Sequence, residues 1–334
     1  MPFSAETAVL LGLLGIGVGA FGTLVGAGGG FILTPVLVLL YPHDSPQTLT
    51  AISLAVVFFN AASGSLAYAR QGRIDYHSGL VFGAATIPGA IGGALAVGVT
   101  PRRVFDLVMA IVLVTLACWL VLGKVGENGR NGRTGQARAL TDRSGRHYVY
   151  RVPLRLGGLY SLAVGFFSSF LGIGGGVIHV PVLVRALGFP THIATATSHF
   201  VLAQMAGAGT LTHVVAGSFS HGHGLRRTAA LSVGVVLGAQ AGALTSLRLN
   251  AAVIEWLLAL ALAGLSARCS RSSREQRLLH QNVATCRPTR LTRSRRERGR
   301  HRRGLEHGPA PDRSRQRPPV ARARGADGVD PARF

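Results

Sequence analysis

The chain carries one glycine-rich segment twice, in each case within apolar sequence. Residues 26–38 read GAGGGFILTPVLV and residues 172–184 read GIGGGVIHVPVLV, so four glycines and one proline recur at an offset of 146. Glycine disfavours helix by about 1 kcal/mol relative to alanine, so each cluster predicts a break in an apolar helix. Paired apolar segments with such breaks, one in each half of a chain, are typical of the midplane binding site of a membrane transporter.

Long uncharged segments indicate a membrane protein. Residues 8–40 and 156–184 contain no Asp, Glu, Lys or Arg, and charged residues make up 14% of the chain against about 25% in soluble domains. A spanning helix needs about 20 apolar residues. The candidate segments are 8–40, 48–69, 78–99, 104–122, 156–187, 192–216, 228–247 and 250–267. We therefore expect an all-α integral membrane protein with about eight transmembrane helices, of which the first and fifth are broken at their glycine clusters.

The duplication extends beyond the glycine clusters, because an offset of 145 pairs Ser53 with Ser198 and also matches several later glycines. This pattern predicts two homologous four-helix repeats. The expected order is a first repeat 1–122, a basic cytoplasmic linker 123–155, a second repeat 156–267 and an Arg-rich tail 268–334. An even number of spans per repeat would make the repeats parallel, whereas an odd number, if the broken segment crosses twice, would make them inverted. The sequence leaves both arrangements open.

The net charge of +22 is concentrated outside the apolar segments. The linker has eight Lys/Arg and two acidic residues, and the tail has nineteen Arg and six acidic residues. If eight spans alternate, the side that receives both termini and the linker also receives Arg70, Arg73, Arg226 and Arg227, and the other receives Arg102, Arg103, Arg185 and Arg248. The positive-inside rule then predicts an inner-membrane protein with both termini in the cytoplasm.

The tail, residues 268–334, lacks apolar periodicity, and its composition is typical of a disordered segment. Three interpretations compete: an arm that contacts anionic lipid, an RNA-binding arm, or translation of a shifted reading frame, since the tail is rich in Arg and lacks Lys. None of them places the function in the tail, and we expect no specific nucleic-acid partner.

The glycine clusters are the candidate substrate site. A helix that restarts after a break points unpaired N–H groups and the positive end of its dipole toward the break, so two such ends would bind an anion without a buried Lys or Arg. Neighbouring hydroxyls would add hydrogen bonds, and a tightly packed kink is the alternative. The predicted substrate-binding residues are Gly26, Gly28, Gly29, Gly30, Ser53, Gly172, Gly174, Gly175, Gly176, Thr197 and Ser198.

Three histidines, His179, His199 and His213, fall within expected helices of the second repeat. An ionisable residue within the membrane is costly and commonly functional, and histidine exchanges protons near neutral pH. These residues are therefore the candidates for carrying a coupled proton. No carboxylate falls in the middle of an expected span, which argues against a carboxylate-lined cation site. The three cysteines lack metal-ligand spacing, and we expect neither a metal nor a cofactor.

Together these motifs resemble the sulfite exporter TauE/SafE family of membrane permeases. The similarity covers about residues 8–266 and rests on G-x-G-G-G, an apolar turn, Pro, a loop and Ala-Thr-Ser. The second copy has these as Gly172–Gly176, Val180-Pro181, Gly188-Phe189-Pro190 and Ala196-Thr197-Ser198, with His213 ahead of Gly217. The first copy has Ala51-Ile52-Ser53 for Ala-Thr-Ser and Tyr68 for the histidine, which argues against a proton role shared by both halves.

The resemblance implies a polytopic inner-membrane permease for small anions such as sulfite, sulfoacetate or other organosulfonates, with export as the usual direction. We therefore expect a secondary transporter of a small anion in the lipid bilayer, with a coupled proton and a homo-oligomer as options. An enzyme is not expected, because the sequence has no nucleophile–base constellation and no H-E-x-x-H motif. A passive anion channel and a non-transporting membrane scaffold or assembly protein are the alternatives.

Overall fold

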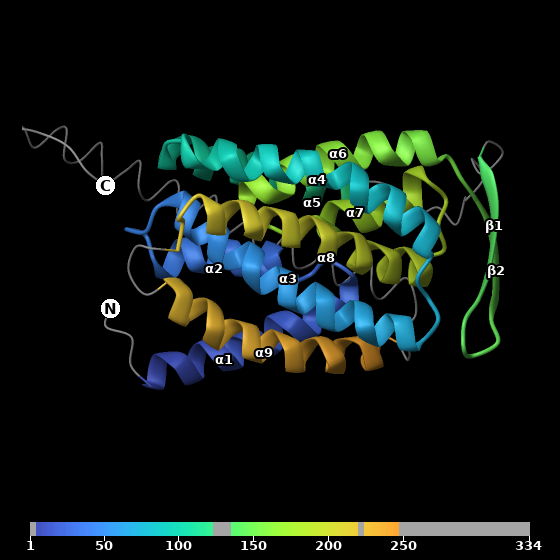
Figure 1. Ribbon diagram of the computed structural model, residues 1–334, viewed down its shortest axis with the longest axis horizontal. Helices are drawn as coiled ribbons and strands as arrows, with labels where there is room; N and C mark the ends of the chain where they lie inside the picture. Colours follow the sequence, from blue (N-terminus) through green and yellow to red (C-terminus); the bar gives the residue numbers. More distant parts are fainter. Residues whose placement is uncertain (1–4, 123–134, 220–223, 247–334) are drawn as a thin grey trace, which may run out of the picture. The chain divides into compact units, whose positions relative to one another are not determined.

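A computed structural model describes residues 5–122, 135–219 and 224–246 of the 334-residue chain (Figure 1). The described residues are mostly helical. In order, the elements are α1 Ala5–Val25, α2 Gly30–Leu40, α3 Pro46–Arg70, α4 Tyr76–Gly98, α5 Arg102–Leu122, β1 Gln136–Thr141, β2 His147–Val152, α6 Leu154–Leu171, α7 Gly176–Pro181, the π-helix η2 Val182–Ala186, α8 Thr191–Val215 and α9 Gly224–Thr245. The expected last span, 250–267, and the tail, 268–334, lie outside the described residues.

Five of the described helices, α1, α3, α4, α6 and α9, are long and apolar enough to cross a membrane. Their outward faces are apolar: Leu13 on α1, Leu95 on α4 and Leu237 on α9 are each more than half exposed. Polar side chains lie in the interior instead, where Ser53 and Asn60 of α3 are fully buried. An apolar exterior around a partly polar interior is the arrangement that lipid requires.

The helices end at the two glycine clusters. α1 stops at Val25 and α2 starts at Gly30, with Gly26, Gly28 and Gly29 all at positive φ, of 79°, 74° and 79°. α6 stops at Leu171 and α7 starts at Gly176, and Gly172 and Gly174 have φ of 66° and 73° in the same sense. Residues with a Cβ rarely adopt this left-handed conformation, so these connections require glycine.

Small residues allow close approach of α1 to α9 and of α4 to α6. A Cβ added to Gly234, Gly238 or Gly242 of α9 would meet the carbonyl oxygens of Gly12, Ile16 and Ala20 of α1, respectively. The numbers rise together, so α1 and α9 run parallel with their backbones in contact. The counterpart pair is α4 and α6, in which Cβ atoms on Gly89 and Gly93 would meet the carbonyl oxygens of Leu162 and Phe166. Close approach through small residues is the usual way in which membrane helices pack.

The equivalent helices α3 and α8 run in opposite directions. A Cβ on Gly209 of α8 would lie 3.1 Å from Leu54, one on Gly207 would lie 3.2 Å from Phe58, and one on Gly64 of α3 would contact His199. Residue numbers that increase along α3 therefore contact residue numbers that decrease along α8, so the two helices are antiparallel. Since the offset of 145 relates these two helices, equivalent segments of the halves have opposite orientations.

The loops gather at two ends of the described helices. At the first, which we call the Asp44 end, Arg102 Nη1 donates to the Asp44 carbonyl oxygen at 2.7 Å, and Arg227 Nη1 lies 2.6 Å from Asp44 Oδ2. At the second, the hairpin end, Arg73 Nε lies 3.9 Å from Asp142 Oδ2, and the Arg143 N–H donates to the Gln71 carbonyl oxygen at 3.1 Å. α1 begins at the Asp44 end, because it runs parallel to α9 (Figure 1).

This arrangement corrects the expected sides of the loops. Arg226 and Arg227 lie at the Asp44 end with Arg102 and Arg103, whereas Arg70 and Arg73 lie with the linker at the hairpin end. The prediction that the N-terminus and the linker share one side is wrong for the described residues. The reason is that α1 begins at the Asp44 end and the loop after α2 lies at the same end, so α1 and α2 together return to the end at which they start.

The linker contains a β-hairpin, so the expectation of an all-α chain is wrong in this segment. Strands β1 and β2 pair antiparallel from Gln136 opposite Val152 to Thr141 opposite His147. Alternate residues on β2 face inward: Tyr148 is partly buried, and Tyr150 and Val152 are buried, whereas Val149 between them is 80% exposed. This period of two is the normal pattern of a strand with one covered face.

Candidate functional site

The two glycine clusters lie directly against each other. A Cβ on Gly30 would meet the carbonyl oxygen of Ile173, and a Cβ on Gly176 would meet the carbonyl oxygen of Gly26 and the Cα of Ala27, 2.6 Å away. Backbone therefore packs on backbone, which a side chain at either position would prevent. The structure thus brings together the glycine segments that the sequence places 146 residues apart.

Hydroxyl groups link each repeat to the break of the other. Ser53 Oγ donates to the Gly172 carbonyl oxygen at 2.6 Å, and Thr34 Oγ1 lies 2.7 Å from the same oxygen. In the other direction, Ser198 Oγ donates to the Gly26 carbonyl oxygen at 3.4 Å. The two serines correspond by the offset of 145, and the two glycines by the offset of 146. The hydrogen bond from Ser53 to Gly172 is therefore the counterpart of the hydrogen bond from Ser198 to Gly26, and both lie where the two glycine breaks meet.

The helices that follow the breaks start with N–H groups that have no intrahelical acceptor. α2 begins at Gly30, and the helical segment that α7 and η2 form together begins at Gly176. The first turn of any such helix leaves N–H groups unpaired and carries the positive end of the helix dipole. Backbone groups with this character can hold an anion without a buried cationic side chain.

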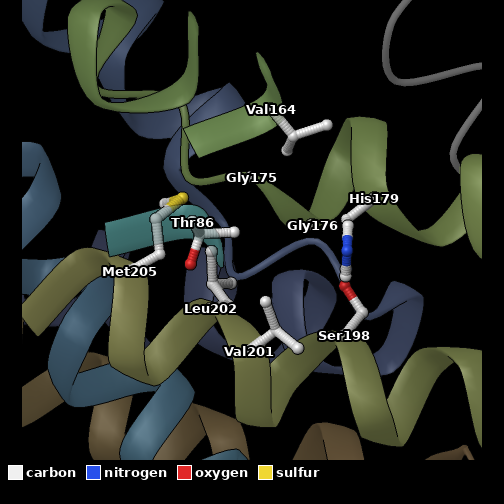
Figure 2. A pocket seen from close by; sticks show the side chains of 9 residues that line it. All are labelled: Thr86, Val164, Gly175, Gly176, His179, Ser198, Val201, Leu202 and Met205. Carbon is white, nitrogen blue, oxygen red and sulfur yellow. The ribbon is translucent and has the colours of Figure 1, made fainter. Parts of the chain in front are cut away.

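A small cavity lies beside the second break (Figure 2). Its volume is about 10 Å³, measured as the space open to the centre of a water molecule, which is room for about one water. The lining residues are Thr86, Val164, Gly175, Gly176, His179, Ser198, Val201, Leu202 and Met205. Figure 2 shows His179 of α7 and Ser198 of α8 directed into the same space. This conformation is therefore closed around the break rather than open for an anion of several atoms.

The three histidines occupy three different environments. His179 is 2% exposed and its Nε2 lies 3.1 Å from Ser161 Oγ. Nε2 of His199 lies 3.2 Å from Thr23 Oγ1, whereas Nδ1 of His213 lies 3.1 Å from the Ser218 hydroxyl near the Asp44 end. Among them, His179 lines the cavity. Within the described part of the chain, no three His, Cys, Asp or Glu side chains are grouped so that they could hold a metal ion.

The remaining predicted residue, Thr197, faces the hairpin end. Its Oγ1 accepts a hydrogen bond from the Asp75 N–H at 3.1 Å, just before α4 begins. Two threonines that the sequence reasoning missed lie closer to the site: Thr86 lines the cavity, and Thr23 contacts His199 and donates to Asn60 Oδ1 at 3.2 Å. The available signal was a polar side chain in an apolar helix, but threonine can satisfy its hydroxyl on its own helix, which makes that signal weak.

A larger hollow, which we call the vestibule, opens at the Asp44 end with a volume of about 460 Å³. It is lined by residues 43–45, 47–48 and 216–218, which are the loop after α2, the start of α3 and the end of α8. Gln47 Nε2 donates to Ser218 Oγ across it at 3.0 Å, and Ser218 in turn contacts His213. The vestibule therefore connects one of the buried histidines to the surface at this end.

Comparison with known proteins identifies relatives over most of the chain. The family described as "Sulfite exporter TauE/SafE" matches residues 11–269. "Probable membrane transporter protein YunE" of Bacillus subtilis is 28% identical over 260 residues, which cover 76% of this chain and 94% of that protein. "Probable membrane transporter protein MJ0441" of Methanocaldococcus jannaschii is 25% identical, covering 62% and 72%. A "Probable membrane transporter protein" of Xylella fastidiosa is 27% identical, covering 56% and 65%. No solved structure matches the chain significantly.

Proposed function

Because the chain belongs to the sulfite exporter TauE/SafE family of membrane transporters, we propose that it is a secondary carrier that exports a small anion such as sulfite or an organosulfonate. The observation that carries this proposal is the crossing of the two glycine breaks, with Ser53 and Ser198 each bonded to the break of the other repeat. Backbone N–H groups and hydroxyls are neutral donors that suit an anion, and their duplication gives two similar half-sites.

Binding requires the crossing to open. The cavity holds about one water, so an anion of the size of sulfite enters only when α7 and α8 move apart around Gly175 and Ser198. We propose that the glycines of both breaks then present their N–H groups to the anion, and that Ser53 and Ser198 add hydroxyl donors, whereas Thr197 lies toward the hairpin end. His179 is the proposed proton carrier, because it lines the cavity at the same break.

We further propose two inverted repeats with eight membrane segments, the last at 250–267. Each repeat would consist of a broken segment that enters and leaves on one side, followed by three crossing helices; the antiparallel α3 and α8 support this. The described arginines at the hairpin end, in the loops, the hairpin and the adjoining helix ends, are Arg70, Arg73, Arg138, Arg143, Arg146, Arg151, Arg155 and Arg185, and those at the Asp44 end are Arg102, Arg103, Arg226 and Arg227. By the positive-inside rule the hairpin end would face the cytoplasm.

This topology predicts that the two ends label from opposite sides of the inner membrane. In a chain whose native cysteines are serine, Arg143→Cys at the hairpin turn should react with an impermeant thiol reagent in inside-out vesicles, and Glu6→Cys at the start of α1 in intact cells. Both residues are exposed, so access is not limited by packing. Labelling of both from the same side would contradict the inverted arrangement.

Transport itself is tested with the full chain in proteoliposomes. Radiolabelled sulfite flux is measured with and without an imposed pH gradient, against empty vesicles. Flux that follows the gradient supports the coupled carrier, and loss of that coupling in His179→Gln would support the proton assignment. Flux that ignores the gradient favours the passive channel. Absence of sulfite, sulfoacetate and sulfate flux would reject the proposed cargo and favour the scaffold alternative.

A further inference from the structure

The linker hairpin fills the place that corresponds to the vestibule in the other repeat. The repeat offset of 145 maps the vestibule-lining segments 43–48 and 216–218 onto 188–193 and 71–73. These counterparts are the loop before α8 and the turn after α3, and both lie at the hairpin end. One mouth is therefore hollow, whereas its equivalent at the opposite end is covered by the hairpin.

Apolar contacts hold the hairpin in this mouth. The ring of Tyr150 lies 4.9 Å from the ring of Phe189, centroid to centroid, and Tyr150 OH donates to Asp75 Oδ2 at 3.0 Å. Val152 packs in the same buried cluster as Leu187. Burial raises the pKa of the Tyr150 phenol, and so does the Asp75 carboxylate, so the phenol remains a hydrogen-bond donor. The inward face of the hairpin is thus an integral part of the packing at this end.

A buried cation lies under the hairpin. Arg73 is 1% exposed, its Nε is 3.9 Å from Asp142 Oδ2, and its Nε and Nη2 have no hydrogen-bond partner among the residues that the structure describes. Burial lowers the Arg73 pKa, and Arg146 lowers it further. Asp142 is buried as well, yet its pKa lies below its ordinary value, because N–H groups of Arg146 and Ser144 and the Arg146 charge outweigh the effect of burial.

A guanidinium with unpaired donors is matched to an oxyanion, which it binds through parallel N–H groups. We propose that the hairpin is a gate over this mouth, and that the Asp142 carboxylate lies against Arg73 in the position that the transported oxyanion takes when the gate opens. The class of ligand, a small sulfur oxyanion, rests on the proposed function. The gate itself rests on the contacts of Tyr150, Val152 and Asp142 alone.

The gate is tested by the accessibility of a residue beneath it. Ile193, which is fully buried in the cluster with Tyr150 and Val152, is replaced by cysteine in the full chain with its native cysteines changed to serine. Weakening the gate with Asp142→Asn or Tyr150→Phe should raise the rate at which an impermeant methanethiosulfonate labels this introduced thiol in proteoliposomes by about tenfold or more. Val149→Ala, on the exposed face of the same strand, is the matched control and should leave the rate unchanged. Equal rates in all four proteins, the Ile193→Cys parent included, would overturn the gate.

The anion position is tested in the Asp142→Asn protein that carries Ile193→Cys. A negatively charged methanethiosulfonate should label the introduced thiol faster than a positively charged one, and sulfate, an oxyanion that does not react with the reagent, should slow the negative reagent. Adding Arg73→Gln should remove both effects. If the charge preference and the sulfate protection survive in Arg73→Gln, Arg73 is not the anion position. Because labelling needs no transport, a protein that carries no sulfite but opens and binds sulfate in this way would reject the proposed cargo while supporting the gate.

Discussion

Gly176→Ala is expected to destabilise the protein where the two glycine breaks pack against each other. The new Cβ would overlap the Gly26 carbonyl oxygen and lie 2.6 Å from the Ala27 Cα, and both are backbone atoms that cannot rotate away. Overpacking of a core usually costs about 1–3 kcal/mol, and we expect about 3 kcal/mol here because no side chain can yield. The thermal midpoint of the purified protein should fall by roughly 10 °C, with less monodisperse protein recovered.

The control for this substitution is Gly158→Ala on α6, where the nearest atom to an added Cβ is the Ala85 Cβ at 3.9 Å. It changes the same residue type in an apolar helix and should keep the midpoint of the unmodified chain. Gly30→Ala, whose Cβ would meet the Ile173 carbonyl oxygen, should behave like Gly176→Ala. A midpoint for either variant equal to that of the control would mean that the two breaks do not cross as closely as the structure indicates.

The glycine segments and the serines next to them could be recognised from the sequence more fully than the architecture around them. Gly26 and Gly172 are recognisable because the left-handed backbone at each break requires glycine, and a requirement of this kind leaves an identical residue in both copies. Ser53 and Ser198 are paired by the offset of 145, and each was found bonded to the break of the opposite half. That these bonds cross between repeats could not be predicted, because an offset relates positions in sequence and not the partners that packing supplies.

The relative orientation of the two repeats could not be predicted from the sequence for a related reason. Whether a repeat returns inverted depends on the parity of its crossings, and parity depends on whether α2 continues from α1 or turns back. Apolar composition is the same in both cases. The evidence lies in tertiary contacts such as those of Arg227 and Arg102 with Asp44, which join residues from three distant segments. The hairpin was concealed because Val149 is an apolar residue on the exposed face of β2 and Arg138 is a charged residue on the partly buried face of β1, and both interrupt the alternation of apolar and polar residues that a strand would otherwise show.

Gly175→Leu is expected to abolish transport while leaving the protein inserted and folded. Gly175 lines the cavity and has an ordinary helical φ of −60°, so a side chain causes no backbone strain there. A Cβ would lie 3.1 Å from Met205 Sδ and from Val164 Cγ1, which are side-chain atoms that can move. A leucine side chain is far larger than the space for about one water, so it would occupy the opening that the anion needs.

Gly175→Ala separates this blockage from damage to the fold, since a methyl group adds the same Cβ without filling the cavity. Sulfite flux into proteoliposomes should fall to the level of empty vesicles for Gly175→Leu and remain measurable for Gly175→Ala, with similar thermal midpoints for the two proteins. The neighbouring Gly176 is surrounded by backbone atoms, whereas Gly175 is surrounded by side chains that can move. Substitution of Gly176 should therefore lower stability, and substitution of Gly175 by leucine should block transport. Undiminished flux in Gly175→Leu would show that the break is a structural kink and that the anion passes elsewhere.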